Sequence, residues 1–227
     1  MSFTLSWYGH AAFGLRIGEL RLLLDPFISG NPSAPVAVDN LEADFILISH
    51  GHGDHVGDAV NIAKRTDALI ISTFEIATWF EKQGFKTHGQ HIGGGYLHPF
   101  GYLKLTLALH GSALPDGSDG GNPAGFLLTS TNGEKIYFAC DTGLFGDMRL
   151  IGEEGIDLAV LPIGDNFTMG PDDALRAVQF IQPKHVIPVH YNTFELINQD
   201  PAKWAERVRT ETDAIPHILK PGESFSF

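Results

Sequence analysis

Short apolar runs separated by turn signals recur along the chain and predict a mixed α/β fold. Runs typical of buried or half-buried strands lie at 3–7, 13–17, 20–24, 45–48, 69–72, 102–110, 125–130, 135–140, 157–162 and 185–189. Helical patterns lie at 54–65, at 73–83, after Pro171 and at 201–212. Strands followed by strand–helix units occur twice, which favours two similar halves.

The repeated order divides a single domain, residues 1–227, into pseudo-duplicated halves of roughly 1–110 and 125–227. Each half would form a mixed sheet with helices on one face. Stacking the two sheets then gives a four-layer αββα sandwich with the helices outside. The segment 111–124 is rich in glycine, so we expect a mobile loop that either gates a nearby site or only connects the halves.

Composition narrows the class of protein. A chain of 227 residues with 43% hydrophobic content can bury an ample core. Its net charge of −12 argues against nucleic-acid and anionic membrane partners. A single cysteine, Cys140, excludes an internal disulfide and favours a reducing compartment. The N-terminal stretch has no signal-peptide pattern and no apolar run reaches membrane-spanning length, so we expect a cytoplasmic protein.

The densest group of ionisable side chains is the stretch His50-Gly51-His52-Gly53-Asp54-His55. His50 and His52 lie two residues apart in an expected loop, so their rings can converge on one metal ion. Asp54 and His55 lie where a helix is expected to begin, and they can reach a second ion. Imidazole and carboxylate suit zinc, manganese or iron. The alternative is a polar loop with several histidines, but chance seldom produces this spacing.

Further ionisable side chains stand at the ends of predicted strands. His110, Asp141 and His190 are of metal-ligand type. A lone strand-end histidine is usually structural, but three such residues beside the 50–55 motif favour a metal site. Because strand side chains alternate, Cys140 should face away from Asp141 and lie in the core. Asp25 also ends a strand, and it is either a turn former or a partner of a ligand histidine.

The order of these residues resembles the metallo-β-lactamase superfamily of metal-dependent hydrolases. Its five motifs are matched along nearly the whole chain by Asp25, the 50–55 motif, His110, Asp141 and His190. Three short elements narrow the resemblance: Trp7-Tyr8-Gly9-His10, Leu24-Asp25-Pro26-Phe27, and Pro162-Ile163-Gly164 with Phe167-Thr168-Met169-Gly170. They are similar to the branch related to ascorbate-6-phosphate lactonase.

The resemblance implies two divalent metal ions per chain, Zn²⁺ or Mn²⁺ with iron as an alternative. It places His50, His52 and His110 on one ion, Asp54, His55 and His190 on the other, and Asp141 between them with a shared water or hydroxide. Asp54 and Asp141 would be the catalytic residues. Candidates for supporting or substrate contacts are Asp25, His10, Asn166 and Thr168. For His10, a packed strand-end histidine is the equal alternative.

These features predict a dinuclear hydrolase that uses the bridging hydroxide on an ester, lactone or phosphodiester of a small molecule. One alternative is a nuclease-type phosphodiesterase, which the acidic charge disfavours. Another is a non-catalytic metal-binding protein. Redox diiron relatives carry glutamate where His52 stands, so the resemblance favours hydrolysis over electron transfer. The sequence leaves open the substrate, the native metal and homo-oligomer formation.

Overall fold

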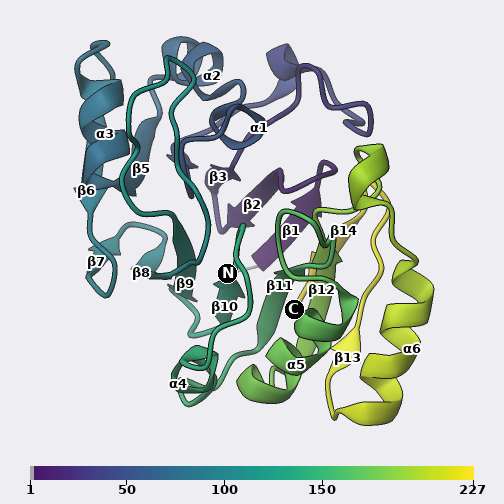
Figure 1. The fold of residues 1–227 in the computed structure, drawn as a ribbon. Helices are drawn as coiled ribbons and strands as arrows, with labels where there is room; N and C mark the ends of the chain where they lie inside the picture. The colour runs from purple at the N-terminus through teal and green to yellow at the C-terminus, as the bar shows by residue number, and fades with distance from the viewer. Residues whose placement is uncertain (1–2) are drawn as a thin grey trace.

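Two seven-stranded sheets face each other in the computed structural model, which describes residues 3–227 (Figure 1). Helices α1–α3 lie outside the first sheet, and α4–α6 lie outside the second. This arrangement confirms the four-layer αββα sandwich expected from the order of strands and helices.

The first sheet holds the N-terminal strands and closes with the C-terminal strand. Its order is β14-β1-β2-β3-β4-β5-β6. The strands are β1 Phe3–Trp7, β2 Phe13–Ile17, β3 Leu20–Leu24, β4 Phe45–Leu47, β5 Leu69–Thr73, β6 Thr87–Gln90 and β14 Ser224–Ser226. The helices on this side are α1 Gly53–Val56, α2 Ala59–Thr66 and α3 Phe74–Glu81, with a short 3₁₀ turn at Val38–Asn40.

The second sheet has the order β13-β12-β11-β10-β9-β8-β7. Its strands are β7 Gly95–His98, β8 Gly101–Leu107, β9 Ala124–Ser130, β10 Lys135–Phe138, β11 Leu158–Pro162, β12 His185–Val189 and β13 Ile215–Pro216. The helices on this side are α4 Met148–Gly152, α5 Pro171–Ile181 and α6 Pro201–Glu211, with a 3₁₀ turn at Glu195–Ile197.

Both sheets share one arrangement of strand directions. Strands β14-β1-β2-β3 are antiparallel and β3-β4-β5-β6 are parallel. In the same way, β7-β8-β9-β10 are antiparallel and β10-β11-β12-β13 are parallel. The chain passes from the first sheet to the second between β6 and β7. Residues 95–107 therefore belong to the second sheet, although they lie within the expected first half of the sequence. Duplication of the halves stays a prediction.

Alternating side chains in the first sheet fill two separate cores. Leu23, Ile46 and Ile70 point outward and belong to a cluster that includes Ile62 of α2 and Phe80 of α3. Their neighbours on the opposite face lie in the core between the sheets, with residues that include Leu22, Leu24, Leu47, Ile71, Phe126 and Phe138. The period of two in the strand sequences therefore accounts for the layered packing.

The prediction of one continuous helix at 54–65 is wrong, because the structure contains two helices there, α1 and α2. Gly57 has a φ of 44°, and a Cβ there would lie 2.6 Å from the carbonyl oxygen of Pro26. The next residue, Asp58, accepts backbone N–H bonds from Ile28 at 3.0 Å and Ser29 at 2.7 Å. Packing of the loop after β3 thus overrides the helical pattern.

Two strands end earlier than their apolar patterns indicate. The strand expected at 102–110 ends at Leu107, so His110 lies in the loop that follows. The strand expected at 135–140 ends at Phe138, and Cys140 has a φ of 54°. Strand alternation therefore does not extend to Asp141, although Cys140 is buried as expected.

The segment 111–124 is a hydrogen-bonded hairpin rather than an irregular loop. Ala113 pairs with Asp119 in an antiparallel bridge, and the N–H of Gly120 donates to the carbonyl of Ser112 at 2.8 Å. The indole N–H of Trp79 on α3 donates to Asp116 at 2.7 Å. These bonds hold the hairpin against the first sheet's helices, and its role as a gate stays a prediction.

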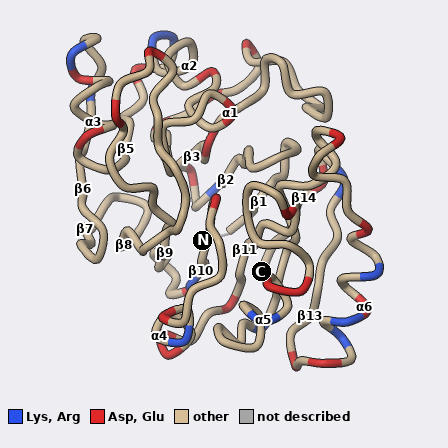
Figure 2. The backbone as a smooth tube through the Cα atoms, in the orientation of Figure 1, with Lys and Arg blue, Asp and Glu red and all other residues tan. Residues whose placement is uncertain are grey.

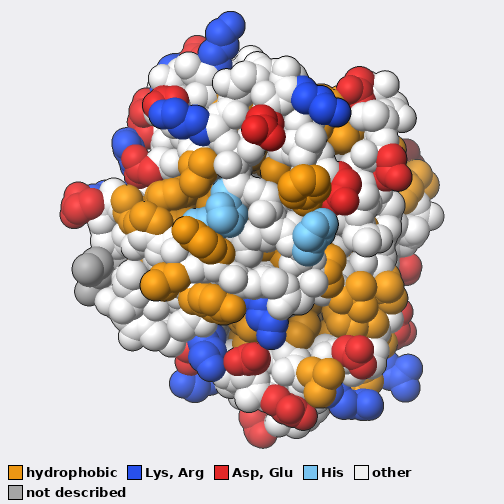
Figure 3. Space-filling model, turned by 90° about the vertical axis from the view of Figure 1, so that its left-hand side faces the viewer, with side chains coloured by type: hydrophobic (Ala, Val, Ile, Leu, Met, Phe, Trp, Pro, Cys, Tyr) orange, Lys and Arg blue, Asp and Glu red, His pale blue; other side chains and the backbone are white. Residues whose placement is uncertain are grey.

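Apolar side chains remain exposed on the side of the molecule that carries α3 and β7, where Figure 3 shows them gathered around two histidines. Phe74 is 54% exposed, Tyr96 51% and Leu97 73%. Within residues 3–227, no helix is long and apolar enough to cross a membrane.

His98, buried beside Phe100, should make the metal-free protein less stable in acid. Burial, with the nearby charge of His88, lowers the pKa of His98 to about 4. An unfolded histidine titrates near 6.5, so between these values only the unfolded chain binds the proton. Stability therefore falls as pH decreases through this window. We expect His98→Phe to make the decline shallower when urea unfolding is followed across this window. An unchanged slope would contradict this role for His98.

Candidate metal centre

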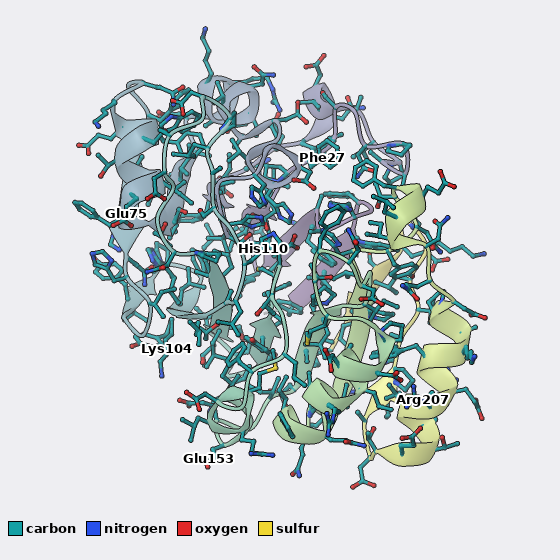
Figure 4. The ribbon with its side chains drawn as sticks, viewed as in Figure 1. Phe27, Glu75, Lys104, His110, Glu153 and Arg207 are labelled. Atoms are coloured by element: carbon teal, nitrogen blue, oxygen red, sulfur yellow. The ribbon has the colours of Figure 1, made fainter. Side chains whose placement is uncertain are left out.

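The side chains expected to bind metal all follow the ends of strands at one edge of the sandwich. His10 follows β1, Asp25 follows β3, and the 50–55 motif follows β4. From the second sheet, His110 follows β8, Asp141 follows β10 and His190 follows β12. Figure 4 shows His110 near the middle of the view. The site thus lies at the carboxyl ends of parallel strands, where α/β sheets carry their sites.

Left-handed backbone turns direct several of these side chains inward. The φ angles are 53° at His10, 45° at Asp25, 54° at Cys140 and 56° at His190. Such angles are uncommon outside glycine and gather at functional sites. At Cys140 the turn leaves the thiol 3.7 Å from the carbonyl oxygen of Phe138 and the next side chain, Asp141, inside the site.

One group consists of three imidazole rings. His50 Nε2 lies 3.0 Å from His52 Nδ1, and His110 Nε2 lies 3.3 Å from the same atom. The three nitrogens lie within 4.8 Å of one another. A neutral imidazole has one lone-pair nitrogen and one N–H, so rings that meet in this way suit a shared cation.

A second group lies beside the first and shares a carboxylate with it. Ligand atoms of Asp54, His55, His190 and His10 lie within 4.8 Å of one another. Asp141 Oδ2 lies 3.0 Å from His190 Nε2 and 3.3 Å from His55 Nε2. The same oxygen lies 3.5 Å from His110 Nε2 of the first group. One buried carboxylate oxygen therefore contacts imidazoles of both groups.

These residues fit metal ions on two further observations. Among the described residues, Asp141 Oδ1 is buried without a hydrogen-bond partner, and His55 Nε2 has only its ion-pair contact with Asp141 Oδ2 at 3.3 Å. Buried polar atoms in native proteins are seldom left unsatisfied, and a metal ion would satisfy these two. The donor set of imidazole and carboxylate, without thiolate, suits zinc, manganese or iron.

Asp25 orients the rings of His55 and His50, the first directly and the second through Ser49. Its Oδ2 accepts bonds from His55 Nδ1 at 2.9 Å and from the Ser49 hydroxyl at 2.5 Å. The Ser49 oxygen in turn accepts from His50 Nδ1 at 2.9 Å. With their Nδ1 protons held in this way, both rings turn Nε2 toward the site. Burial alone would lower the pKa of His55, but the charges of Asp141 and Asp25 raise it well above its usual range, so a metal ion would bind Nε2 by displacing a proton. Asp25 thus bonds a candidate ligand histidine and also forms a left-handed turn after β3, so it has features of both roles considered for it. Ser49 was not singled out from the sequence, where only its place before the motif marks it.

His10 contacts Asp54 directly. His10 Nε2 lies 3.2 Å from Asp54 Oδ2, and His10 Nδ1 lies 3.0 Å from the Thr193 hydroxyl. A carboxylate only accepts, so Nε2 is the donor and Nδ1 accepts from Thr193. This arrangement fixes the carboxylate of Asp54 and makes His10 its positioning residue. No local sequence signal pointed to Thr193.

The carboxylates of the site stay ionised despite their burial. Burial alone would raise the pKa of Asp141, but the charges of His190 and His55 outweigh it and hold the pKa well below its usual range. The pKa of Asp54 is likewise lowered, because the hydrogen bond from His10 opposes the effect of burial. Burial lowers the pKa values of His50 and His110, which keeps these rings neutral and able to bind metal.

The candidate side chains open into a cavity of about 230 Å³. Its lining consists of His52, Asp54, His110, Asp141, Phe167, His190 and Phe194. The expected substrate contacts Asn166 and Thr168 are absent from this lining in the described part of the chain, and Phe167, which lies between them, is present instead. Phe194 lies in the lining too, although an isolated phenylalanine in a loop carries no signal in the sequence.

A family model described as a beta-lactamase superfamily domain matches residues 20–191. The chain belongs to this superfamily. Three relatives named as UPF0173 metal-dependent hydrolases agree over nearly the whole length. The protein of Desulforamulus reducens is 52% identical, covering 96% of this chain and 97% of its own. The proteins of Thermus thermophilus and Heliobacterium modesticaldum are 50% and 48% identical, covering 96% and 98% of this chain and 96% of their own.

Two solved structures show the same fold. Igni18, a metallo hydrolase from Ignicoccus hospitalis, has a TM-score of 0.92 and 34% identity, covering 100% of this chain and 99% of its own. The metallo-beta-lactamase fold protein YhfI from Bacillus subtilis has a TM-score of 0.77 at 14% identity, with full coverage of both chains, and shares the fold alone. This chain is thus a metal-dependent hydrolase of the superfamily.

Two glycines of the 50–55 motif should differ in their tolerance of a methyl group. A Cβ at Gly51 would lie 2.8 Å from the carbonyl oxygen of Ser112, whereas a Cβ at Gly53 meets nothing within 4 Å. We expect Gly51→Ala to push the hairpin away and to weaken metal binding by His50, His52 and His110, as measured by competition with a chelator. Gly53→Ala is the matched control and should bind like the wild type. Equal binding by both variants would contradict this account.

Proposed function

We propose that the chain is a dinuclear hydrolase that acts on an ester, lactone or phosphodiester bond of a small molecule. The observation that carries the proposal is the position of Asp141, whose Oδ2 lies within 3.5 Å of imidazoles from both ligand groups. A carboxylate so placed can bridge two ions. His50, His52 and His110 would hold one ion, and Asp54, His55 and His190 the other.

The chain's own residues would orient the reactants. Two bound divalent ions would lower the pKa of a water molecule and polarise the bond to be cleaved. Asp54, fixed and kept ionised by His10, can accept a hydrogen bond from the attacking water and direct it toward the substrate. Phe167 and Phe194 line the same cavity and would contact a substrate bound there.

The volume of the cavity and the charge of the protein support a small-molecule substrate. The cavity of about 230 Å³ lies below the range of about 300–1,000 Å³ usual for drug-sized ligands. Figure 2 shows basic residues dispersed over the helices rather than gathered in a stripe, and the net charge is −12. Both features disfavour the nuclease alternative. The lactone class is supported by the sequence resemblance alone, and a cytoplasmic location by the single buried cysteine, Cys140.

Turnover of reporter substrates tests the proposal and separates it from a non-catalytic metal protein. We would supply the Zn²⁺- or Mn²⁺-loaded protein with 4-nitrophenyl acetate, an aliphatic lactone and bis(4-nitrophenyl) phosphate. We expect hydrolysis of at least one of these substrate classes. The hydrolysis should disappear when a chelator is added and return when metal is restored. If the protein with two bound ions hydrolyses none of the three substrate classes, the metal site has only a structural role and the proposal is wrong.

A further inference from the structure

Two phenylalanines stand half-exposed at the mouth of the candidate metal centre. The side chains of Phe167 and Phe194 are 51% and 41% exposed, and both line the cavity that contains Asp54, Asp141 and His190. They come from separate segments, Phe167 from the loop after β11 and Phe194 from the loop after β12. Two solvent-exposed rings that line one small cavity indicate a binding role rather than a core role.

The loop that carries Phe167 is built to hold it in place. Asp165 and Asn166 have φ angles of 63° and 48°, two consecutive left-handed residues immediately before the phenylalanine. The N–H of Asp165 donates to the carbonyl of Met169 at 3.1 Å, and the N–H of Met169 donates to the carbonyl of Thr142, next to Asp141, at 2.9 Å. Strained turns of this kind persist where the surroundings fix them, and they gather at binding sites.

The segment that carries Phe194 is fixed to the metal centre itself. Its neighbour Thr193 bonds His10 Nδ1 at 3.0 Å, and the ring of Phe194 lies edge-on to His10 at 5.5 Å between centroids. Asn192, with a φ of 58°, donates its N–H to the carbonyl of Ile197 at 2.9 Å. Phe194 is therefore placed relative to Asp54 through His10, and little ordering is needed when a substrate binds.

The cavity provides no basic side chain for an anionic substrate. Its lining among the described residues contains no lysine or arginine, and its two carboxylates belong to the metal ligands. Recognition would then combine the ions at the reacting bond with two phenyl rings beside it. Flat apolar groups pack well against phenyl faces and edges.

We propose that Phe167 and Phe194 form an aromatic clamp for a flat, apolar group of a neutral carboxylic ester or lactone. The clamp rests on the proposed hydrolase function and narrows it to substrates that carry a flat apolar group. The absence of a basic side chain from the described lining favours a neutral ester or lactone over a phosphodiester. Phe167 and Phe194 are on this account the residues that determine specificity.

Binding of two hydroxamates tests the clamp without turnover. Benzohydroxamate and acetohydroxamate present the same metal-binding group and differ in the phenyl ring. We expect the Zn²⁺-loaded protein to bind benzohydroxamate at least about tenfold more tightly, by calorimetry. Phe167→Ala and Phe194→Ala should each reduce this preference to within about threefold, with unchanged metal content. Phe74→Ala removes an equally exposed ring on α3 and should keep the full preference.

Turnover on the same preparations separates failure of the clamp from failure of the hydrolase. Phenyl acetate should exceed ethyl acetate in kcat/KM, and the phenyl preference should fall in both clamp variants through a higher KM. An unchanged preference in the variants, or equal binding of both hydroxamates by wild type with two ions bound, overturns the clamp. Preferential benzohydroxamate binding without hydrolysis of any ester keeps the clamp and overturns the proposed hydrolase function instead.

Discussion

Asp141→Ala should abolish hydrolysis while leaving the fold in place. The side chain is 4% exposed, and its Oδ2 contacts His55, His110 and His190. Without it, the second ion would keep only Asp54, His55 and His190, and the repulsion between the ions would no longer be offset. Three imidazoles are sufficient for one ion, so the first should remain. Activity should fall by more than about a hundredfold, beyond the 10–100-fold usual for loss of an outer partner.

Elemental analysis, thermal unfolding and ester hydrolysis on one preparation would check this result. The variant should retain close to one ion per chain and unfold cooperatively, because Asp141 follows β10 and is not part of the apolar packing. Wild-type turnover with two ions bound would remove Asp141 from the site. If the wild type has no hydrolytic activity and the variant mainly shows a lower melting temperature, the metal site stabilises the fold and is not catalytic.

Asp25→Ala should produce the largest combined loss of stability and metal affinity. Asp25 is fully buried and accepts bonds from the Ser49 N–H, the Ser49 hydroxyl and His55 Nδ1. Truncation leaves these donors without an acceptor, which costs about 3–5 kcal/mol of unfolding free energy. It also frees the ring of His55 to turn, so affinity at the second ion should fall about 10–100-fold. Urea unfolding and chelator competition measure the two effects.

Asp58→Ala is the matched control for Asp25→Ala. Asp58 is also buried and accepts two backbone N–H bonds, from Ile28 and Ser29, but it orients no metal ligand. Its loss should reduce stability by about 1–3 kcal/mol per unsatisfied donor and leave metal affinity unchanged. If the two variants lose metal affinity equally, Asp25 acts through general stability rather than through His55.

The sequence predicts the parts of the fold whose apolar pattern is strong. Strands β1, β2 and β3 lie where alternation and the Gly18 turn placed them. Strands β6 and β7 were missed because they are edge strands of the two sheets, with few buried side chains. The break between α1 and α2 was missed because it arises from contact of Gly57 with Pro26, which no local pattern encodes.

Some residues of the candidate site can likewise be predicted from local sequence, whereas others depend on contacts between distant segments. The 50–55 motif is local, and its residue types and spacing alone indicate a metal site that could serve two ions. His110, Asp141 and His190 follow strands, so strand order brings them to one edge. The bond from Thr193 to His10 joins residues 183 positions apart, and its existence depends on how the two sheets stack. Packing of this kind cannot be deduced from one sequence.

Stepwise metal titration with turnover at each step tests the central claim most directly. Metal-free protein would receive Zn²⁺ or Mn²⁺ in fractions of an equivalent, with bound metal and ester hydrolysis measured on the same sample. The dinuclear site predicts binding that saturates near two ions per chain and hydrolysis that rises mainly with the second. Saturation at one ion, or full activity reached before a second ion binds, would contradict it.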